Sequence, residues 1–259
     1  MNSFVRKCIA SVMLAGSVLS LHAAQAAEPQ DLKGKNVVLV HGAFADGSCW
    51  EKVIPLLEAR GLHVVAVQNP LSSLADDAAA AKRAIDAQTG PVVLVGHSWG
   101  GAVISQAGND DKVKALVYVA AFAPDSGQSI NDMLKGKPAP AWVSELQKDS
   151  GNFLTLSSKA IDNDFAQDLS PAQKRVVAAT QGPWFAGATD DKVTDAAWRT
   201  KPSYYLVANH DRMIDPRLQD AMAGQIKAKV THVDSSHVPM LSKPEAVANA
   251  IIEAAAKAQ

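Results

Sequence analysis

Residues 91–107 read PVVLVGHSWGGAVISQA, and this stretch decides the fold. An apolar run at 91–95 is followed by Gly96-His97-Ser98-Trp99-Gly100 and then by a run at 101–107 that is compatible with a helix. The pentapeptide matches the pattern G-x-S-x-G, in which a serine lies on a sharp turn between a strand and a helix. Glycines flank the serine because bulky neighbours would clash with the strained backbone of such a turn. The stretch therefore predicts that the Ser98 hydroxyl projects from the turn as a nucleophile, at the N-terminus of a helix.

The rest of the chain alternates between expected strands and expected helices. Continuous β-branched runs such as 37–40 are typical of strands that are buried on both faces. The expected strands are 37–40, 62–67, 92–95, 113–121, 204–208 and 228–233, and the expected helices include 51–60, 74–88 and 244–257. This order predicts an α/β fold with a mainly parallel sheet flanked by helices. In such sheets ligands bind beyond the carboxyl ends of the strands, where we expect the functional site.

One long segment, about residues 124–202, interrupts the alternation and contains no obvious strand. It holds several prolines and three of the five tryptophans, Trp142, Trp184 and Trp198. A helix is expected within 162–181, with Ser170-Pro171 as a cap and first helical residue. A connection of about 75 residues between two core strands is too long for a simple loop. We therefore expect a mostly helical cap insertion that folds over the site.

The N-terminus has the features of an export signal. Arg6 and Lys7 precede an apolar stretch at 8–21 that is too short to span a bilayer. Ala24-Gln25-Ala26 has the small-x-small pattern of a cleavage site. We expect residues 1–26 to be a signal peptide that is cleaved after Ala26, and residues 27–259 to form a periplasmic or secreted domain. The alternative interpretation is an N-terminal membrane anchor.

Charge and cysteine content argue against several classes of function. The chain has 25 basic and 26 acidic residues, and no basic cluster of the kind that binds nucleic acid. No later apolar run is long enough to span a bilayer, so we expect a soluble mature protein without stable membrane insertion. Cys49 is the only cysteine outside the expected signal, and we interpret it as a buried hydrophobic residue rather than a catalytic thiol. No metal-ligand spacing and no phosphate-binding loop is present, so we expect no metal and no organic cofactor.

A serine nucleophile requires a general base and an acid that orients the base. When the serine lies on a strand–turn–helix, the usual order along the chain is serine, acid, histidine. His237 follows the expected strand 228–233 and precedes the final helix, which makes it the expected base. Asp211 and Asp215 both follow the strand 204–208, and Asp211, closer to the strand end, is the expected acid. Asp215 immediately precedes Pro216 and is interpreted as the N-cap of the next helix.

The oxyanion of a tetrahedral intermediate requires hydrogen-bond donors, which are usually backbone N–H groups. The N–H of Trp99, the residue after the nucleophile, is one expected donor. The second should come from the loop after the first strand, where Gly42 lets the backbone approach the substrate closely. The N–H of Ala43 is the first choice and that of Phe44 the second.

Four motifs together resemble the α/β-hydrolase superfamily: residues 38–43 (VLVHGA), 96–101 (GHSWGG), the Asp211 loop and 236–241 (SHVPML). Within that superfamily the chain is similar to the branch of plant methylesterases and hydroxynitrile lyases and their bacterial esterase-like relatives. The resemblance implies an α/β-hydrolase fold and a catalytic triad of Ser98, Asp211 and His237.

Two positions depart from the lyases of that branch. The lyases carry a lysine directly after the catalytic histidine and a hydroxylated residue in the first loop. Val238 and Gly42 occupy these positions here, which argues against cyanohydrin cleavage and favours hydrolysis. The nucleophile Ser98 also disfavours dehalogenase and epoxide hydrolase chemistry, in which the nucleophile is an aspartate.

These features predict a secreted serine hydrolase that cleaves a small-molecule carboxylic ester through an acyl-enzyme. We expect Phe44, Phe122, Trp184 and Phe185 to contact the substrate, although such aromatic residues are equally typical of the core of a cap. The alternatives are hydrolysis of an amide, a lactone or a C–C bond by the same triad, or a receptor of the same fold that binds a ligand without turnover. Nothing in the sequence indicates an oligomeric state.

Overall fold

The computed structural model describes residues 32–258, so the expected signal peptide at 1–26 lies outside the described residues. A six-stranded parallel sheet forms the centre of the fold, in the strand order β2-β1-β3-β4-β8-β9. The strands are β1 (Asn36–Val40), β2 (His63–Val67), β3 (Val92–His97), β4 (Val113–Val119), β8 (Ser203–Ala208) and β9 (Lys229–Val233). The expectation of an α/β fold with a mainly parallel sheet is confirmed.

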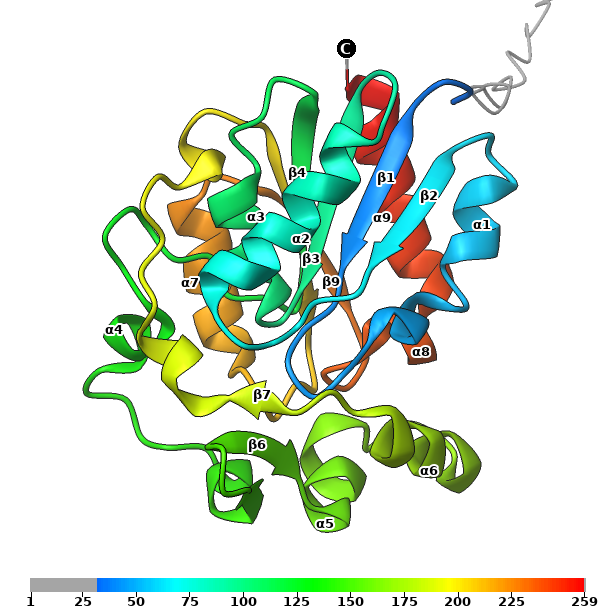
Figure 1. The fold of residues 1–259 in the computed structure, drawn as a ribbon. Helices are drawn as coiled ribbons and strands as arrows, with labels where there is room; N and C mark the ends of the chain where they lie inside the picture. Colours follow the sequence, from blue (N-terminus) through cyan, green and yellow to red (C-terminus); the bar gives the residue numbers. More distant parts are fainter. Residues whose placement is uncertain (1–31, 259) are drawn as a thin grey trace, which may run out of the picture.

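Helices cover both faces of this sheet. In Figure 1, α2 (Leu74–Asp86) and α3 (Gly100–Ala107) lie on one face, and α1 (Ile54–Glu58) and α9 (Pro244–Lys257) lie on the other. The helices α7 (Pro216–Gln225) and α8 (Pro239–Ser242) follow β8 and β9. Strands β1, β3 and β8 are buried along their whole length, which explains why their sequences are apolar without alternation.

Most elements end within two residues of the expected bounds, and two differences concern the end of one strand and the length of one helix. The strand expected at 113–121 ends at Val119, because Ala120 adopts φ 44° in the left-handed region and cannot continue a strand. The helix expected at 51–60 is reduced to α1, with a short 3₁₀ turn (Gly47–Trp50) before it.

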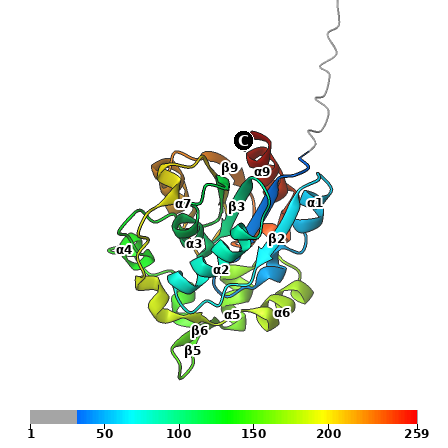
Figure 2. The ribbon, with the colours of Figure 1, turned by 45° about the horizontal axis from the view of Figure 1, so that its top comes forward.

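The insertion, residues 124–202, lies across the carboxyl ends of the strands (Figure 1). Its helices are α4 (Ile130–Leu134), α5 (Ser158–Ala160) and α6 (Pro171–Thr180), and a π-helical turn spans Ile161–Phe165. It also carries three strands, β5 (Leu146–Lys148), β6 (Phe153–Leu156) and β7 (Trp184–Phe185), which form an antiparallel sheet in the order β5-β6-β7. Figure 2 shows β5 and β6 at the edge of the molecule.

The insertion is therefore less helical than expected, since it contains three strands that the sequence did not predict. Each is two to four residues long, which is too short for a recognisable period along the sequence. The helix expected within 162–181 is also interrupted. Pro171 disfavours the helical conformation at Ser170, which is extended with φ −65° and ψ 154°, and the helix begins at Pro171.

Within residues 32–258, no helix is both long and apolar enough to cross a membrane.

The close approach of α3 to the loop after β4 gives a testable constraint on folding. A Cβ added to Gly101 would stand 2.1 Å from the backbone oxygen of Phe122 and 2.8 Å from the Cβ of Ala121. Because backbone must move to relieve this contact, Gly101→Ala should lower the free energy of unfolding by about 1–3 kcal/mol. Urea unfolding measures the change. Gly224→Ala is the matched control, since this helical glycine in α7 has nothing within 4 Å of an added Cβ. The control should be neutral or stabilising by up to about 1 kcal/mol, and equal losses in both variants would contradict the account.

Candidate active site

Ser98 lies on the sharp turn between β3 and α3, with φ 52° in the left-handed region. Its carbonyl oxygen accepts hydrogen bonds from Gly101 N at 3.0 Å and Phe122 N at 3.1 Å, which anchor the turn to α3 and to the loop after β4. The left-handed conformation of a non-glycine residue stores strain that the surrounding packing has to support. The predicted elbow geometry is thus present in the backbone.

His237 follows β9 and meets both Ser98 and Asp211. The Nε2 atom of His237 lies 2.9 Å from Ser98 Oγ, and its Nδ1 atom lies 2.7 Å from Asp211 Oδ2. A carboxylate only accepts hydrogen bonds, so Nδ1 carries the imidazole proton and Nε2 accepts from the Ser98 hydroxyl. All three residues are buried. The arrangement can therefore transfer the hydroxyl proton to a neutral imidazole.

Asp211 lies in the loop after β8, and four N–H donors bind the two oxygens of its carboxylate. Oδ1 accepts from Met213 N at 2.7 Å and Ile214 N at 3.0 Å, and Oδ2 accepts from Gln219 Nε2 at 2.7 Å as well as from His237. Gln219 is itself fully buried in α7. These donors leave the carboxylate one orientation, in which Oδ2 faces the imidazole.

Asp215 is the other candidate for the acid in the sequence analysis. It is the N-cap of α7, and its Oδ1 accepts from Arg217 N at 2.9 Å. The Arg217 guanidinium beside it lowers the pKa of its carboxyl group. The structure thus brings Asp211, and not Asp215, to His237.

Two aromatic side chains pack on the His237 ring. The His97 ring lies 4.7 Å from it and donates Nε2–H to the His237 carbonyl at 2.8 Å. Burial, with a smaller contribution from His237, holds the pKa of His97 well below its usual value, so His97 is neutral. Phe165, from the π-helical turn of the insertion, lies 5.4 Å from the His237 ring. Asp168 Oδ2 accepts from Ser236 N at 2.9 Å, so the insertion also holds the backbone before His237.

The loop after β1 presents a backbone amide to the same site. Asn69 N donates to His41 Nε2 at 2.9 Å, so the His41 proton lies on Nδ1, which donates to the Gly42 carbonyl at 2.9 Å. Burial lowers the pKa of His41, which keeps the ring neutral and this tautomer in place. Because a trans peptide points C=O and N–H in opposite directions, fixing the Gly42 carbonyl also fixes the direction of the Ala43 N–H.

Three amides near Ser98 have no partner within residues 32–258: the N–H groups of Ala43, Phe44 and Trp99 donate to no group there. A Cβ added at Gly42 would stand 2.7 Å from Ser98 Cβ, so glycine is required for the loop to approach this closely. Ala43 and Trp99 line the same cavity as Ser98 and His237. Their amides are therefore available to a ligand.

This cavity has a volume of about 550 Å³ and is mostly apolar. Of the four aromatic residues expected to contact substrate, Phe44, Phe122 and Trp184 line it. Phe185 does not, which corrects that expectation. Successive side chains of a strand point to opposite sides, so with Trp184 facing the cavity, Phe185 packs instead on Phe153, at 5.5 Å between ring centroids.

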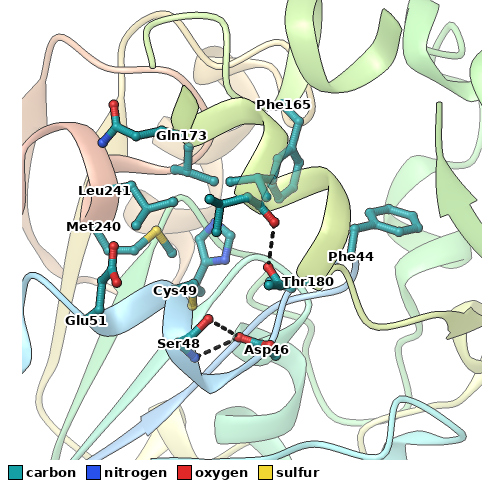
Figure 3. Close-up of a pocket in the computed structure, with 15 residues that line it drawn as sticks. Phe44, Asp46, Ser48, Cys49, Glu51, Phe165, Gln173, Thr180, Met240 and Leu241 are labelled. Atoms are coloured by element: carbon teal, nitrogen blue, oxygen red, sulfur yellow. Dashed lines mark hydrogen bonds between the residues drawn. The ribbon is translucent and has the colours of Figure 1, made fainter. Parts of the chain in front are cut away.

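A second, smaller cavity of about 170 Å³ lies beside the site (Figure 3). Phe44 lines both cavities, whereas neither Ser98 nor His237 lines the smaller one. Cys49 lines it and is buried, and burial raises the pKa of its thiol, as befits a small apolar residue.

Among residues 32–258 no three His, Cys, Asp or Glu side chains are grouped so that they could hold a metal ion.

Several residues of the site were missed from the sequence. Gln219 and Phe165 support the Asp211–His237 pair, and Trp142 lines the large cavity and donates Nε1–H to the Met213 carbonyl at 3.1 Å. A weak signal existed for Gln219, which lies three residues before the buried Met222 on the apolar side of α7. The π-helical turn that places Phe165 gave no signal.

Comparison with known proteins identifies the family of the chain. Residues 37–250 match the family model described as the alpha/beta hydrolase family. A pyrethroid hydrolase from Sphingobium wenxiniae is 28% identical, over 84% of this chain and 86% of that protein. Methylesterase 1 from Arabidopsis thaliana is 25% identical, over 88% of this chain and 98% of that protein.

Among solved structures, that of polyneuridine aldehyde esterase superposes with a TM-score of 0.75 at 21% identity, covering 85% of this chain and 99% of that one. The sheet order, the elbow and these matches agree, and the resemblance to methylesterases and their bacterial relatives is confirmed. The chain belongs to the alpha/beta hydrolase family and is an esterase-type hydrolase.

Proposed function

We propose that the protein is a serine carboxylesterase in which Ser98, His237 and Asp211 form the catalytic triad. The observation that carries this proposal is the unbroken hydrogen-bond chain from Asp211 through His237 to Ser98, at the wall of an apolar cavity. The same cavity offers the free amides of Ala43 and Trp99. A nucleophile, a base, an orienting acid and oxyanion donors are the parts that acyl transfer requires.

In this mechanism Ser98 Oγ attacks the ester carbonyl while His237 Nε2 accepts the hydroxyl proton. The oxyanion that forms accepts hydrogen bonds from the amides of Ala43 and Trp99, each contributing about 3–4 kcal/mol to transition-state stabilisation. The imidazolium then protonates the departing alcohol, which leaves an acyl-enzyme at Ser98. His237 next removes a proton from water, the resulting hydroxide attacks the acyl group, and the acid leaves with Ser98 reprotonated.

The size and lining of the cavity favour esters with a bulky apolar part. Besides Phe44, Phe122 and Trp184, its wall includes Ile130, Leu134, Trp142, Val143 and Leu154. Two relatives are named a pyrethroid hydrolase and a methylesterase, which supports carboxylic esters as the substrate class.

Removing the nucleophile is the direct test of this proposal. Ser98→Ala should lower kcat for a p-nitrophenyl ester by roughly 10⁴- to 10⁶-fold, the scale found when a triad nucleophile is removed. A thermal unfolding curve close to that of the native protein would show that the fold persists. Turnover in the variant similar to that of the native enzyme would exclude the mechanism. A panel of amides, lactones and C–C substrates, assayed with the same pair, tests the alternative bonds.

The acid can be tested by comparing two aspartates of the same loop. In Asp211→Asn the side-chain oxygen would stay on the amides of Met213 and Ile214, so the NH₂ group would face His237. The imidazole would then place its proton on Nε2 and could not accept one from Ser98, and kcat should fall by about 10³- to 10⁴-fold. Asp215→Asn loses an exposed pair with Arg217 and should change kcat far less. Larger losses in the Asp215 variant would contradict the assignment of Asp211.

We further propose that the protein is exported and cleaved after Ala26, on the strength of Arg6, Lys7, the apolar stretch at 8–21 and the small-x-small site. Expressed from its full sequence in a Gram-negative bacterium, the protein should appear in the periplasmic fraction with the N-terminal sequence Ala27-Glu28-Pro29-Gln30. N-terminal sequencing of that fraction measures this. An intact N-terminus in the membrane fraction would instead support the anchor.

A further inference from the structure

Asp77, in the first turns of α2, is a buried carboxylate that the proposed mechanism does not use. Its side chain is 0% exposed, and no lysine, arginine or histidine within residues 32–258 forms an ion pair with it. Burial raises the pKa of its carboxyl group to about 6, although hydrogen bonds from Trp99 and Leu71 act in the opposite direction. Placing an unpaired charge out of water costs folding free energy.

Two N–H donors face the two oxygens of this carboxylate. Leu71 N donates to Oδ1 at 2.8 Å, and the indole Nε1–H of Trp99 donates to Oδ2 at 2.7 Å. The ionised carboxylate accepts both bonds, and hydrogen bonds to a charged acceptor are the stronger ones. Protonation removes the charge and part of the acceptor capacity of one oxygen, which weakens the hold on the two donors.

Both donors lead to the strand β7 of the insertion. Leu71 is held in the left-handed region with φ 58°, and its carbonyl accepts from Phe185 N at 2.9 Å. The Trp99 ring lies 5.2 Å from the ring of Trp184, which lines the large cavity beside Ser98. One carboxylate thus supports two contacts between the core and the wall of the cavity.

We propose that Asp77 is a positioning residue, whose carboxylate holds the Trp99 indole and the Leu71 backbone so that β7 and Trp184 form the wall that binds bulky esters. This inference rests on the proposed esterase function, because it concerns the preference of that site for bulky over small substrates. Ser98 and His237 do not depend on this wall for their own hydrogen bonds, so a small ester needs it less.

The sign of the pH dependence follows from the raised pKa. Since the pKa of Asp77 lies above the value of about 4 for an unfolded chain, its ionisation costs stability as the pH rises from about 4 to about 6. Above that range the carboxylate accepts both bonds and the wall is held. As the pH falls through about 6, the hydrogen bonds that hold the wall weaken, and the preference for bulky esters should fall with them.

The charged groups around Asp77 do not supply an alternative titration. On α2, the neighbouring Asp76 is exposed and accepts from Ser72 Oγ, which lowers the pKa of its carboxyl group. The elbow and the Leu71 loop face Asp77 with groups that do not ionise, Trp99 and Leu71. From the insertion, Asp191 accepts from Leu74 N at the start of the same helix.

The test is the ratio of kcat/KM for p-nitrophenyl 4-phenylbutanoate to that for p-nitrophenyl acetate, measured between pH 5 and pH 8. Both esters share the leaving group and the base His237, so the ratio compares only how the site accommodates the two acyl groups. In the native enzyme the ratio should fall by up to about tenfold between pH 8 and pH 5, because about a tenth of the Asp77 carboxyl groups stay ionised one pH unit below a pKa of about 6. Asp77→Asn replaces one acceptor oxygen by an NH₂ donor, so it loses one of the two bonds and should give a low ratio at every pH.

Asp76→Asn is the matched control, because it removes the adjacent carboxylate on the same helix without touching Trp99 or Leu71. The Asp76 charge contributes to the raised pKa of Asp77, so the comparison is made at pH 8, where Asp77 is ionised and the ratio should equal that of the native enzyme. A native ratio that does not change with pH, or equal ratios for the Asp76 and Asp77 variants, would overturn the proposal. If Asp77→Asn fails to fold, the native pH profile alone decides. Ester turnover that survives Ser98→Ala would contradict the proposed function, whereas a flat ratio with Ser98-dependent turnover contradicts only the role of Asp77.

Discussion

The left-handed turn at Ser98 is the constraint on which the rest of the site depends. With φ 52°, the backbone can reverse from β3 into α3 within one residue, and the Ser98 carbonyl is tied to both α3 and the loop after β4. The packing that supports this turn leaves no room for side chains at the flanking glycines. Because the sheet is parallel, β8 and β9 end at the same edge as β3. The loops that carry Asp211 and His237 therefore lie beside Ser98.

The insertion covers this edge of the sheet and also contacts the residues around His237. Its π-helical turn places Phe165 on the His237 ring, and Asp168 holds the amide of Ser236. Strand β7 places Trp184 against the ring of Trp99. The same segment therefore lines the cavity and packs on His237, which couples the shape of the cavity to the position of the imidazole.

The sequence was sufficient for the sheet, for the elbow and for the expectation that Asp211, rather than Asp215, lies beside His237, since each depends on local patterns and on strand order. It was insufficient where a role depends on contacts distant in the chain. Asp76 and Asp77 look alike in the sequence, yet one is exposed and the other fully buried beneath Trp99. A signal existed, because Asp77 falls three residues after Leu74 and four before Ala81 on the buried side of α2. Strand β7, only two residues long, gave none, and so the direction of Phe185 could not be foreseen.

The central claim is that Ser98 alone carries the acyl group during turnover. The most direct measurement is intact-protein and peptide mass spectrometry after reaction with a fluorophosphonate, taken alongside residual ester hydrolysis. The account predicts one adduct per chain, on the peptide containing Ser98, with activity lost in proportion to labelling. An adduct elsewhere, or full activity in completely labelled protein, would contradict it.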